Sequence, residues 1–499
     1  MKKSYLSKIV CLFFIVALVV CGCSFTGLNK YSKNLIEYSI KLHFNSEEKT
    51  LQGEQTVNYI NTTDVALSQI DFHLYPNAFK NENGQQKVVS DYNYERAYPN
   101  GFDSGYIDIN AVQLSNETAT FSYAESENTI LQVNLKDKLY PNERIKIKID
   151  FTVKIPNINH RFGYGESTIN IGNFYPIACV YEGGEGGGFK HDGYHYNGDP
   201  FYSEMANYNV EITYPTNLKI GATGSCVSDK VEGNLCTKTY DAKVVRDFAI
   251  VLSDKFETQN VEYENVKILY MFYKDNEPDK TVNTIKDALR TFNNLIGTYP
   301  YETLTVVQSN FIQGGMEYPN IVLISDEVEV QSDYFNVIVH EIAHQWFYNI
   351  IGNDEVSEAW LDEGLTEYVT AMFYDLNEGY GATCDEVVAS MLNSYLLFVD
   401  VYNDIFGNLD TSMDRSLSEF GSEYEYTYMV YIKSVLMLDN LREVIGDANF
   451  CLGLKTYFEN NKFKIAKKEN FIRDFNKASN QDIKGLINSW IEGKVEIKN

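Results

Sequence analysis

Apolar and polar residues alternate along much of the first half of the chain. The alternation is regular over residues 38–44, 131–135 and 145–151, and Val210, Ile212, Ile220 and Val227 repeat it. A period of two is typical of a β-strand with one buried face. Long helical patterns are absent between about residues 30 and 255. This part of the chain therefore predicts an antiparallel β-sheet domain.

From about residue 256 the pattern changes. Residues 261–272 and 304–307 have the character of strands, and residues 278–299 place apolar side chains on one helical face. Helical patterns then continue to the C-terminus, and the last helix includes residues 486–491. The 499 residues are too many for one core, so two domains are expected. The predicted fold class is α+β and multidomain, with a β domain over 24–255 and a mainly helical domain over 256–499.

Two helical segments in the second domain carry candidate chemistry. The first has Ser332 or Asp333 as its cap and ends before Gly352. The second surrounds residues 360–368, with Ser357 as its expected N-cap. Eighteen residues separate His344 of the first segment from Glu363 of the second. This spacing allows the second helix to return antiparallel to the first.

His340 and His344 are four residues apart, so both rings lie on one face of the first helix. Two neutral imidazoles are two zinc ligands, and a catalytic zinc takes a third protein ligand, for which Glu363 is the candidate. Glu367, one turn further on, is expected to orient His344. Glu341 points away from the line of the histidines and is the candidate general base for attack by a water molecule that zinc activates. The alternative is a solvated glutamate beside two surface histidines, which the presence of Glu363 disfavours.

The segments His340-Glu-Ile-Ala-His344 and Trp360-Leu-Asp-Glu-Gly-Leu-Thr-Glu-Tyr368 together resemble the gluzincin metallopeptidases, specifically the aminopeptidase N family. Residues 313–319, Gln-Gly-Gly-Met-Glu-Tyr-Pro, resemble the Gly-x-Met-Glu-Asn strand of that family. The resemblance implies that Glu317 binds the α-amino group of the substrate. It also implies that Gly315 and Met316 line the first substrate subsite. Tyr318 replaces the usual asparagine, which leaves the preference for free N-termini less secure than zinc binding.

The family also places a tyrosine in a Tyr-x-Lys segment well after the zinc helix, where it stabilises the oxyanion. Tyr431-Ile432-Lys433 has this form, so the resemblance assigns Tyr431 as the second catalytic residue. Tyr426 and Tyr428 are the alternatives. Residues 51–53, 198–204 and 245–249 also resemble the N-terminal β domain of the family, so the likeness extends over nearly the whole mature chain. The order of elements resembles a saddle-like β domain followed by a thermolysin-like catalytic domain. The chain would be a short form without the large helical C-terminal domain, with a more open cleft.

The net charge of −27 argues against nucleic acid as a partner, because the surface repels phosphate and no basic cluster offsets it. Residues 183–198 are rich in glycine and contain His191 and His195, four apart. A second metal site is conceivable there, but the glycines make a helix improbable, and a mobile loop near the cleft is favoured. Cys226 and Cys236 flank an expected hairpin turn, so a disulfide between them is left open.

The N-terminus has the features of an export signal. Lys2, Lys3 and Lys8 precede an apolar run over residues 9–20, and Gly22-Cys23 follows it. This arrangement resembles a bacterial lipobox, with residues 1–23 as the signal and Cys23 as the lipidated residue. Cys21, an ordinary secretory signal and an uncleaved anchor are the alternatives.

The pattern of metal ligands predicts one Zn²⁺ per chain, and the resemblance implies a zinc-dependent aminopeptidase. Its substrates would be peptides with a free N-terminus. A lipid anchor would hold it on the extracytoplasmic face of a bacterial membrane. The alternatives are an endopeptidase with the same zinc chemistry and a non-catalytic lipoprotein that binds peptides or a partner protein.

Overall fold

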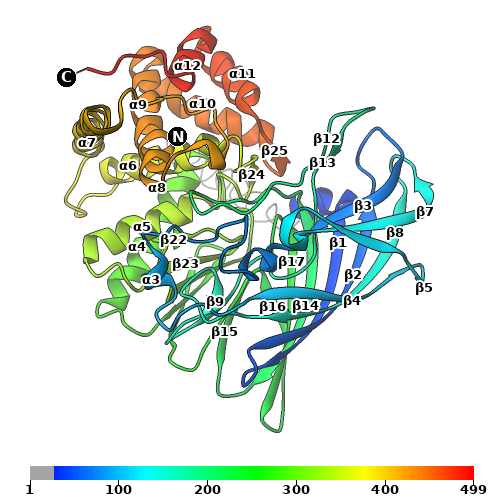
Figure 1. Ribbon diagram of the computed structural model, residues 1–499. Coiled ribbons are helices and arrows are strands. Elements are labelled where there is room, and N and C mark those ends of the chain that lie inside the picture. The colour runs from blue at the N-terminus through cyan, green and yellow to red at the C-terminus, as the bar shows by residue number, and fades with distance from the viewer. Residues whose placement is uncertain (1–26, 499) are drawn as a thin grey trace, which may run out of the picture.

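The structure is a computed structural model that describes residues 27–498; the predicted signal segment and Cys23 lie outside the described residues. Strands make up one part of the molecule, and most of the helices gather at the opposite end (Figure 1). A smaller five-stranded sheet carries Gly315 and Met316 on one of its edge strands. The predicted class, a β-rich N-terminal part followed by a mainly helical part, is confirmed.

The largest sheet has eight strands in the order β16-β17-β14-β1-β2-β8-β4-β5. Along β1 every second residue from Ile36 to Phe44 is buried, as the alternation in the sequence predicts. The expectation of a wholly antiparallel sheet was wrong at one place, because β1 pairs with β14 in parallel. The strands are β1 (Ile36–Asn45), β2 (Thr50–Ile60), β4 (Tyr106–Leu114), β5 (Glu117–Thr118), β8 (Arg144–Lys154), β14 (Ala206–Pro215), β16 (Ser225–Glu232) and β17 (Leu235–Val245).

Two four-stranded sheets and a hairpin complete the N-terminal part. One sheet has the order β15-β18-β10-β9 and the other β11-β3-β7-β6, while β12 and β13 form the hairpin in the glycine-rich segment. Their strands are β3 (Leu67–His73), β6 (Phe121–Ala124), β7 (Ile130–Leu139), β9 (Phe162–Tyr164), β10 (Ile169–Ile171), β11 (Ile177–Ala178), β12 (Tyr181–Glu182), β13 (Gly188–Phe189), β15 (Lys219–Ala222) and β18 (Ile250–Ser253). The short helices here are η1 (Leu28–Lys30), η2 (Ser32–Asn34), η3 (Tyr75–Phe79), α3 (Tyr94–Ala97) and η4 (Ser126–Asn128).

A five-stranded sheet in the order β19-β20-β21-β23-β22 follows. Its strands are β19 (Glu257–Tyr263), β20 (Val266–Phe272), β21 (Thr303–Ser309), β22 (Gly315–Met316) and β23 (Ile321–Ser325). Helix α4 (Pro278–Leu295) connects β20 to β21 and buries the face that the sequence predicts, including Ile285, Ala288, Leu289 and Phe292. Strand β22 pairs antiparallel with β23 at one edge of the sheet, and helix α5 (Gln331–Ala343) follows β23.

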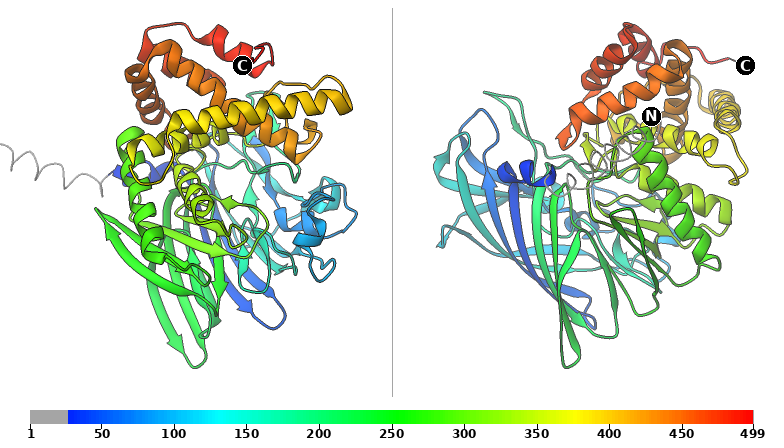
Figure 2. Two further views of the ribbon diagram at one scale, coloured as in Figure 1. Left: turned by 90° about the vertical axis from the view of Figure 1, so that its left-hand side faces the viewer. Right: turned by 180° about the vertical axis from the view of Figure 1, so that it is seen from behind.

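The remaining helices form the end of the molecule that Figure 2 shows from two further sides. They are η5 (Ala359–Leu361), α6 (Glu363–Leu376), α7 (Cys384–Phe406), η6 (Leu417–Glu419), α8 (Glu423–Tyr426), the π-helix η7 (Thr427–Ile432), α9 (Lys433–Ile445), α10 (Asp447–Asn461), α11 (Lys468–Ser479) and α12 (Lys484–Ile491). A short parallel pair, β24 (Ile351–Gly352) with β25 (Lys464–Ile465), joins the zinc-helix region to this end. Within residues 27–498, no helix has both the length and the apolar character that a membrane span requires.

Two expectations about helix N-termini were wrong, and the question left open for Cys226 and Cys236 has an answer in the strand register. Helix α5 is preceded by Val330 and not by Ser332 or Asp333, and α6 begins at Glu363, well after Ser357. The register of the β16–β17 pair places Cys226 opposite Tyr240 and Cys236 opposite Val231. Because the two thiols face different partners along the ladder, both are free and no disulfide joins them.

Candidate active site

Helices α5 and α6 bring the three predicted metal ligands together. Nε2 of His344 lies 3.1 Å from Nε2 of His340 and 3.1 Å from Oε2 of Glu363, and the third edge of the triangle, from His340 to Glu363, measures 3.4 Å. A tetrahedral zinc with bonds of about 2.0–2.1 Å separates its ligands by about 3.4 Å. The side chains of His344 and Glu363 are 1% and 4% exposed, so these two ligands are shielded from solvent. The donor set and its spacing therefore fit one zinc ion.

Glu367 supports a histidine, although not the one that the sequence predicts. Nδ1 of His340 donates a hydrogen bond of 2.7 Å to Oε2 of Glu367. Nδ1 of His344 lies instead near Oγ1 of Thr366, at 3.2 Å, and near a backbone carbonyl. Each contact engages Nδ1 and leaves Nε2 of the ring free to face the metal. Zinc binding through Nε2 requires this tautomer, with the proton on Nδ1.

Glu341 lies against the edge strand. Its side chain is buried, and its Oε2 has no hydrogen-bond partner. Burial and the charge of Glu317 raise the pKa of Glu341 to about 8. A Cβ atom on Gly315 would lie 1.9 Å from Oε1 of Glu341, so only glycine allows this approach of β22 to the helix. A buried carboxyl group beside the metal ligands, with no hydrogen-bond partner on Oε2, is positioned to act as a general base.

Glu317 is 4% exposed, and its Oε1 is also without a hydrogen-bond partner. Its backbone carbonyl accepts a hydrogen bond from Nδ2 of Asn349, which fixes the end of the strand segment. Met316 is buried beside it, and Sδ of Met316 lies 3.2 Å from Nη1 of Arg161. A buried, unpaired carboxylate next to the metal triangle is suited to bind an ammonium group.

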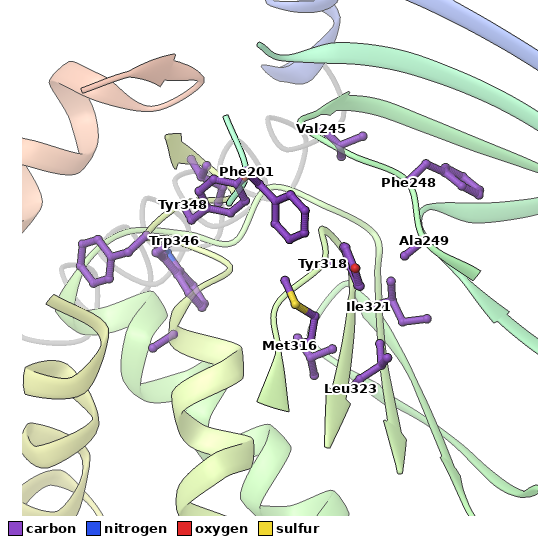
Figure 3. Packing of buried hydrophobic residues seen from close by; sticks show 14 of the residues in the cluster. Phe201, Val245, Phe248, Ala249, Met316, Tyr318, Ile321, Leu323, Trp346 and Tyr348 are labelled. Carbon is purple, nitrogen blue, oxygen red and sulfur yellow. The ribbon is translucent and has the colours of Figure 1, made fainter. Parts of the chain in front are cut away.

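Tyr318 does not face the cleft. Its hydroxyl donates to Oδ1 of Asn173 at 2.8 Å, and its ring belongs to the buried cluster that includes Phe248 and Ala249 (Figure 3). Gly172 makes room for it, because a Cβ there would lie 1.8 Å from the hydroxyl oxygen. Tyr318, the departure from the family motif, therefore lies at the contact between the two parts of the molecule and outside the wall of the cleft.

Tyr431 lies on the π-helix η7, directly before α9. Its hydroxyl donates a short hydrogen bond to Oε1 of Glu363, and its ring centroid is 6.1 Å from that of His340. A π-turn inside a helix is frequent at functional sites because it turns a side chain out of the regular pattern. Tyr426 is buried at 5.8 Å from the Tyr431 ring, and Tyr428 stacks on Phe398, so Tyr431 is the tyrosine at the metal site.

Most of these groups, including Gly315, Glu317, Glu341 and Tyr431, line a cleft of about 360 Å³. Met316, which the resemblance places at the first substrate subsite, lies outside that wall and is buried. Sequence reasoning missed two further residues in its wall, Arg161 and Asp199, which form an ion pair. A carboxylate oxygen of Asp199 lies within 4.8 Å of one on Glu317 and one on Glu363. Asp199 belongs to the 198–204 segment that resembles the family, but no local pattern marked it as part of the site.

The glycine-rich segment is not a second metal site. His191 binds Oδ2 of Asp71 at 2.8 Å, while Nδ1 of His195 accepts a hydrogen bond from the backbone of Asn197. Among residues 27–498, the groups that could hold a metal do not include either histidine. The segment does reach the cleft, because residues 196–199 line it.

Comparison with known proteins agrees with this geometry. Residues 280–490 match the model of the peptidase family M1 domain. This part of the chain is similar to a peptidase family M1 domain. This confirms the resemblance to the aminopeptidase N family and zinc as the cofactor of the site.

Two curated relatives illustrate the extent of the similarity. The chain is 29% identical to glutamyl aminopeptidase of Rattus norvegicus over 156 residues, which is 31% of this chain and 16% of that protein. It is 22% identical to aminopeptidase M1-D of Oryza sativa subsp. japonica over 314 residues, which is 58% of this chain and 34% of that protein. The chain therefore spans about a third or less of the length of these relatives.

A solved structure has a similar fold over most of its length. The M1 zinc metallopeptidase of Deinococcus radiodurans superposes with a TM-score of 0.65 at 16% sequence identity, and the match covers 93% of this chain and 96% of that one. The two-part architecture is thus shared with an M1 peptidase of similar size.

Proposed function

We propose that the protein is a zinc-dependent aminopeptidase that removes N-terminal residues from peptides. The observation that carries this proposal is the position of Glu317, a buried and unpaired carboxylate beside the triangle of His340, His344 and Glu363. A peptide with its ammonium group on Glu317 presents its first peptide bond to that triangle. A variant of the Deinococcus radiodurans peptidase was solved with a Tyr-Ser-Ala substrate, which supports peptides as the substrate class.

Each residue has a defined part in the reaction. Zinc, when bound, supplies a Lewis acid that polarises the carbonyl group and acidifies a water molecule. Glu341 accepts the proton of the attacking water and returns it to the leaving amine. The Tyr431 hydroxyl donates to the oxyanion that develops on the carbonyl oxygen. Glu317 holds the ammonium group, and Gly315 lies in the cleft wall beside the first residue.

The position of Tyr318 supports an aminopeptidase over an endopeptidase. The Tyr318 side chain lies outside the cleft wall and points into the interior. Free-amine selectivity therefore depends on Glu317 and its neighbours.

Hydrolysis by the purified chain from residue 24 onwards, loaded with zinc, tests the proposal. The substrates are a panel of aminoacyl fluorogenic amides and their N-acetylated counterparts, and Glu341→Gln is the inactive control. We expect cleavage of the free-amine substrates only, and none by Glu341→Gln. Equal cleavage of acetylated substrates would assign an endopeptidase. Stoichiometric zinc without any hydrolysis would assign a peptide-binding protein.

We also propose that the protein is exported and tethered by a lipid on Cys23 to the outer face of a bacterial membrane. The basic residues, the apolar run over 9–20 and the Gly22-Cys23 pair support this proposal. Mass spectrometry of the N-terminal peptide of the protein isolated from bacterial membranes tests it. We expect a diacylglyceryl group on Cys23 and release from the membrane fraction in Cys23→Ser, whereas Cys21→Ser should remain bound. An unmodified Cys23 in the mature protein would contradict it.

A further inference from the structure

The cleft has a buried end and an open end. At the buried end lie Glu317, 4% exposed, and the Arg161–Asp199 ion pair, with side chains 7% and 15% exposed. At the open end, Thr427 is exposed and Val337 is half-buried. If the amine of a peptide binds Glu317, as in the proposed function, the rest of the peptide leaves through the open end.

Aromatic side chains gather beside this open end. We call them the aromatic rim, which consists of Tyr92, Phe398, Tyr402, Phe406, Tyr424 and Tyr428. Tyr424 and Tyr428 lie one turn apart on α8 and η7, and Thr427 of the cleft wall is between them in sequence. The aromatic rim is therefore continuous with the cleft.

The aromatic rim has two branches. In one, Tyr424 packs against Tyr92 of the N-terminal part with ring centroids 6.3 Å apart. In the other, Tyr428 stacks on Phe398 at 4.0 Å, and Tyr402 and Phe406 continue along α7 with successive centroid distances of 5.8 and 5.2 Å. The long helix α7 lies at the surface of the helical end (Figure 2).

Three residues of the aromatic rim are exposed, and Phe398, Tyr402 and Tyr428 are half-buried. Tyr92, Tyr424 and Phe406 are 74%, 58% and 75% exposed. Glu423, which lines the cleft, accepts hydrogen bonds of 2.7 Å from Ser90 and 3.1 Å from Asn93 on either side of Tyr92. These hydrogen bonds fix the Tyr92–Tyr424 contact beside the cleft, so the surface is arranged before any ligand arrives.

We propose that the aromatic rim binds the part of a peptide substrate that lies beyond the cleaved bond. This inference rests on the proposed function and specifies its substrate class: peptides that carry aromatic or aliphatic side chains several residues after the first. Flat rings with two rotatable bonds offer a large contact area at a small entropic cost, and aromatic pairs prefer the stacked and edge-on arrangements found here.

The length of the Phe398–Phe406 branch determines how many residues of a bound peptide it can contact. Phe398 and Phe406 are eight residues apart, which corresponds to about 12 Å along the helix. An extended peptide rises about 3.3 Å per residue, so this branch matches about four residues. Dipeptides and aminoacyl amides end before they reach the aromatic rim.

The test compares a short and a long substrate with the same first residue. The short substrate is an aminoacyl coumarin amide, and the long ones are octapeptides with either leucine and phenylalanine or serine at positions 4 to 7. We expect the apolar octapeptide to be cleaved with a kcat/KM about 10-fold above that of the serine octapeptide, mainly through a lower KM. In Tyr92→Ser/Tyr424→Ser this preference should fall to within about 2-fold, while amide hydrolysis remains unchanged.

Tyr140→Ser is the matched control, because Tyr140 is also 58% exposed but lies in the N-terminal part, just after β7. It should retain the full preference for the apolar octapeptide. Binding of a fluorescent apolar octapeptide to zinc-loaded Glu341→Gln, measured by anisotropy, gives a readout that needs no turnover. There too the double substitution should weaken binding about 10-fold.

Three results would overturn the inference. In the first, the wild-type protein hydrolyses the amide but cleaves the apolar and the serine octapeptide with the same kcat/KM. Another is an equal loss of amide and octapeptide cleavage in the double variant, which would show a structural role. The third is unchanged octapeptide kinetics with an altered molecular mass in solution, which would assign the aromatic rim to subunit contact. Absence of all hydrolysis would refute the proposed function instead, and the anisotropy measurement would still decide whether the aromatic rim binds peptides.

Discussion

Oε2 of Glu367 accepts a 2.7 Å hydrogen bond from Nδ1 of His340, across the contact between helices α5 and α6. The hydrogen bond fixes the ring orientation and keeps the proton on Nδ1, so that Nε2 faces the other two ligands. The zinc triangle is therefore held by a fourth residue that does not itself belong to it.

Removal of this support should weaken zinc binding. We expect Glu367→Ala to raise the dissociation constant for zinc about 10- to 100-fold, measured by competition with a chromophoric chelator. Glu367→Gln keeps an acceptor oxygen and should lose less zinc affinity. Thr366→Val, which removes the hydroxyl near His344, is the matched comparison on the same helix. Zinc affinity equal to wild type in Glu367→Ala would show that the hydrogen bond does not orient His340.

The close approach of β22 to Glu341 gives a second prediction. Because a Cβ on Gly315 would lie 1.9 Å from Oε1 of Glu341, Gly315→Ala must displace the carboxyl group. We expect kcat to fall about 100-fold, as for a misplaced catalytic group, while zinc content stays at one per chain. Gly314→Ala is the control, since no atom lies within 4 Å of the added Cβ. The decrease in kcat should be much smaller in this variant. Equal effects of the two substitutions would contradict the geometric argument.

The local part of this site could be predicted from the sequence. The spacing of His340 and His344 determines that they share a helical face, and Glu363 follows at a distance that allows a helix to return. Both features depend only on helical periodicity. The resemblance to a family then supplied roles for Glu317 and Tyr431, and the structure places both residues at the metal triangle.

The contacts between elements could not be predicted in this way. Which histidine Glu367 meets depends on how α5 and α6 cross, and spacing within one helix does not determine that angle. Asp199 and Arg161 come from separate segments of the N-terminal part, so no short pattern joins them. The free state of Cys226 and Cys236 depends on strand register, which a one-residue difference in the hairpin changes completely.

Tyr318 connects the catalytic strand segment to the N-terminal part. Its hydroxyl donates to Oδ1 of Asn173, and both groups are buried. Tyr318→Phe leaves that oxygen without its donor, so we expect the free energy of unfolding to fall by about 1–3 kcal/mol in urea denaturation. The ratio of free-amine to acetylated substrate cleavage should remain that of the wild type. A changed ratio without a stability loss would mean that Tyr318 acts on the cleft.

Asp247 at the same contact makes stability depend on pH. Its Oδ1 accepts hydrogen bonds from the Tyr175 hydroxyl at 2.9 Å and from the Phe248 backbone at 2.8 Å. Burial nevertheless raises the pKa of Asp247 from 3.8 to about 7. Because the folded state holds the proton more tightly than the unfolded state, the contribution of Asp247 to stability is fully present below about pH 4. It is lost as the pH rises to about 7.

Asp247→Asn removes this titration, so the two proteins should differ in the slope of the melting temperature between pH 4 and 8. We expect the melting temperature of the variant to fall less with rising pH than that of the wild type, even if the variant is less stable overall. Asp91→Asn, at a side chain that is 93% exposed, controls for the loss of one negative charge. Parallel slopes for wild type and Asp247→Asn, measured by differential scanning calorimetry, would show that the buried carboxyl group stays ionised across this range. The hydrogen bonds from Tyr175 and Phe248 would then outweigh the cost of burial.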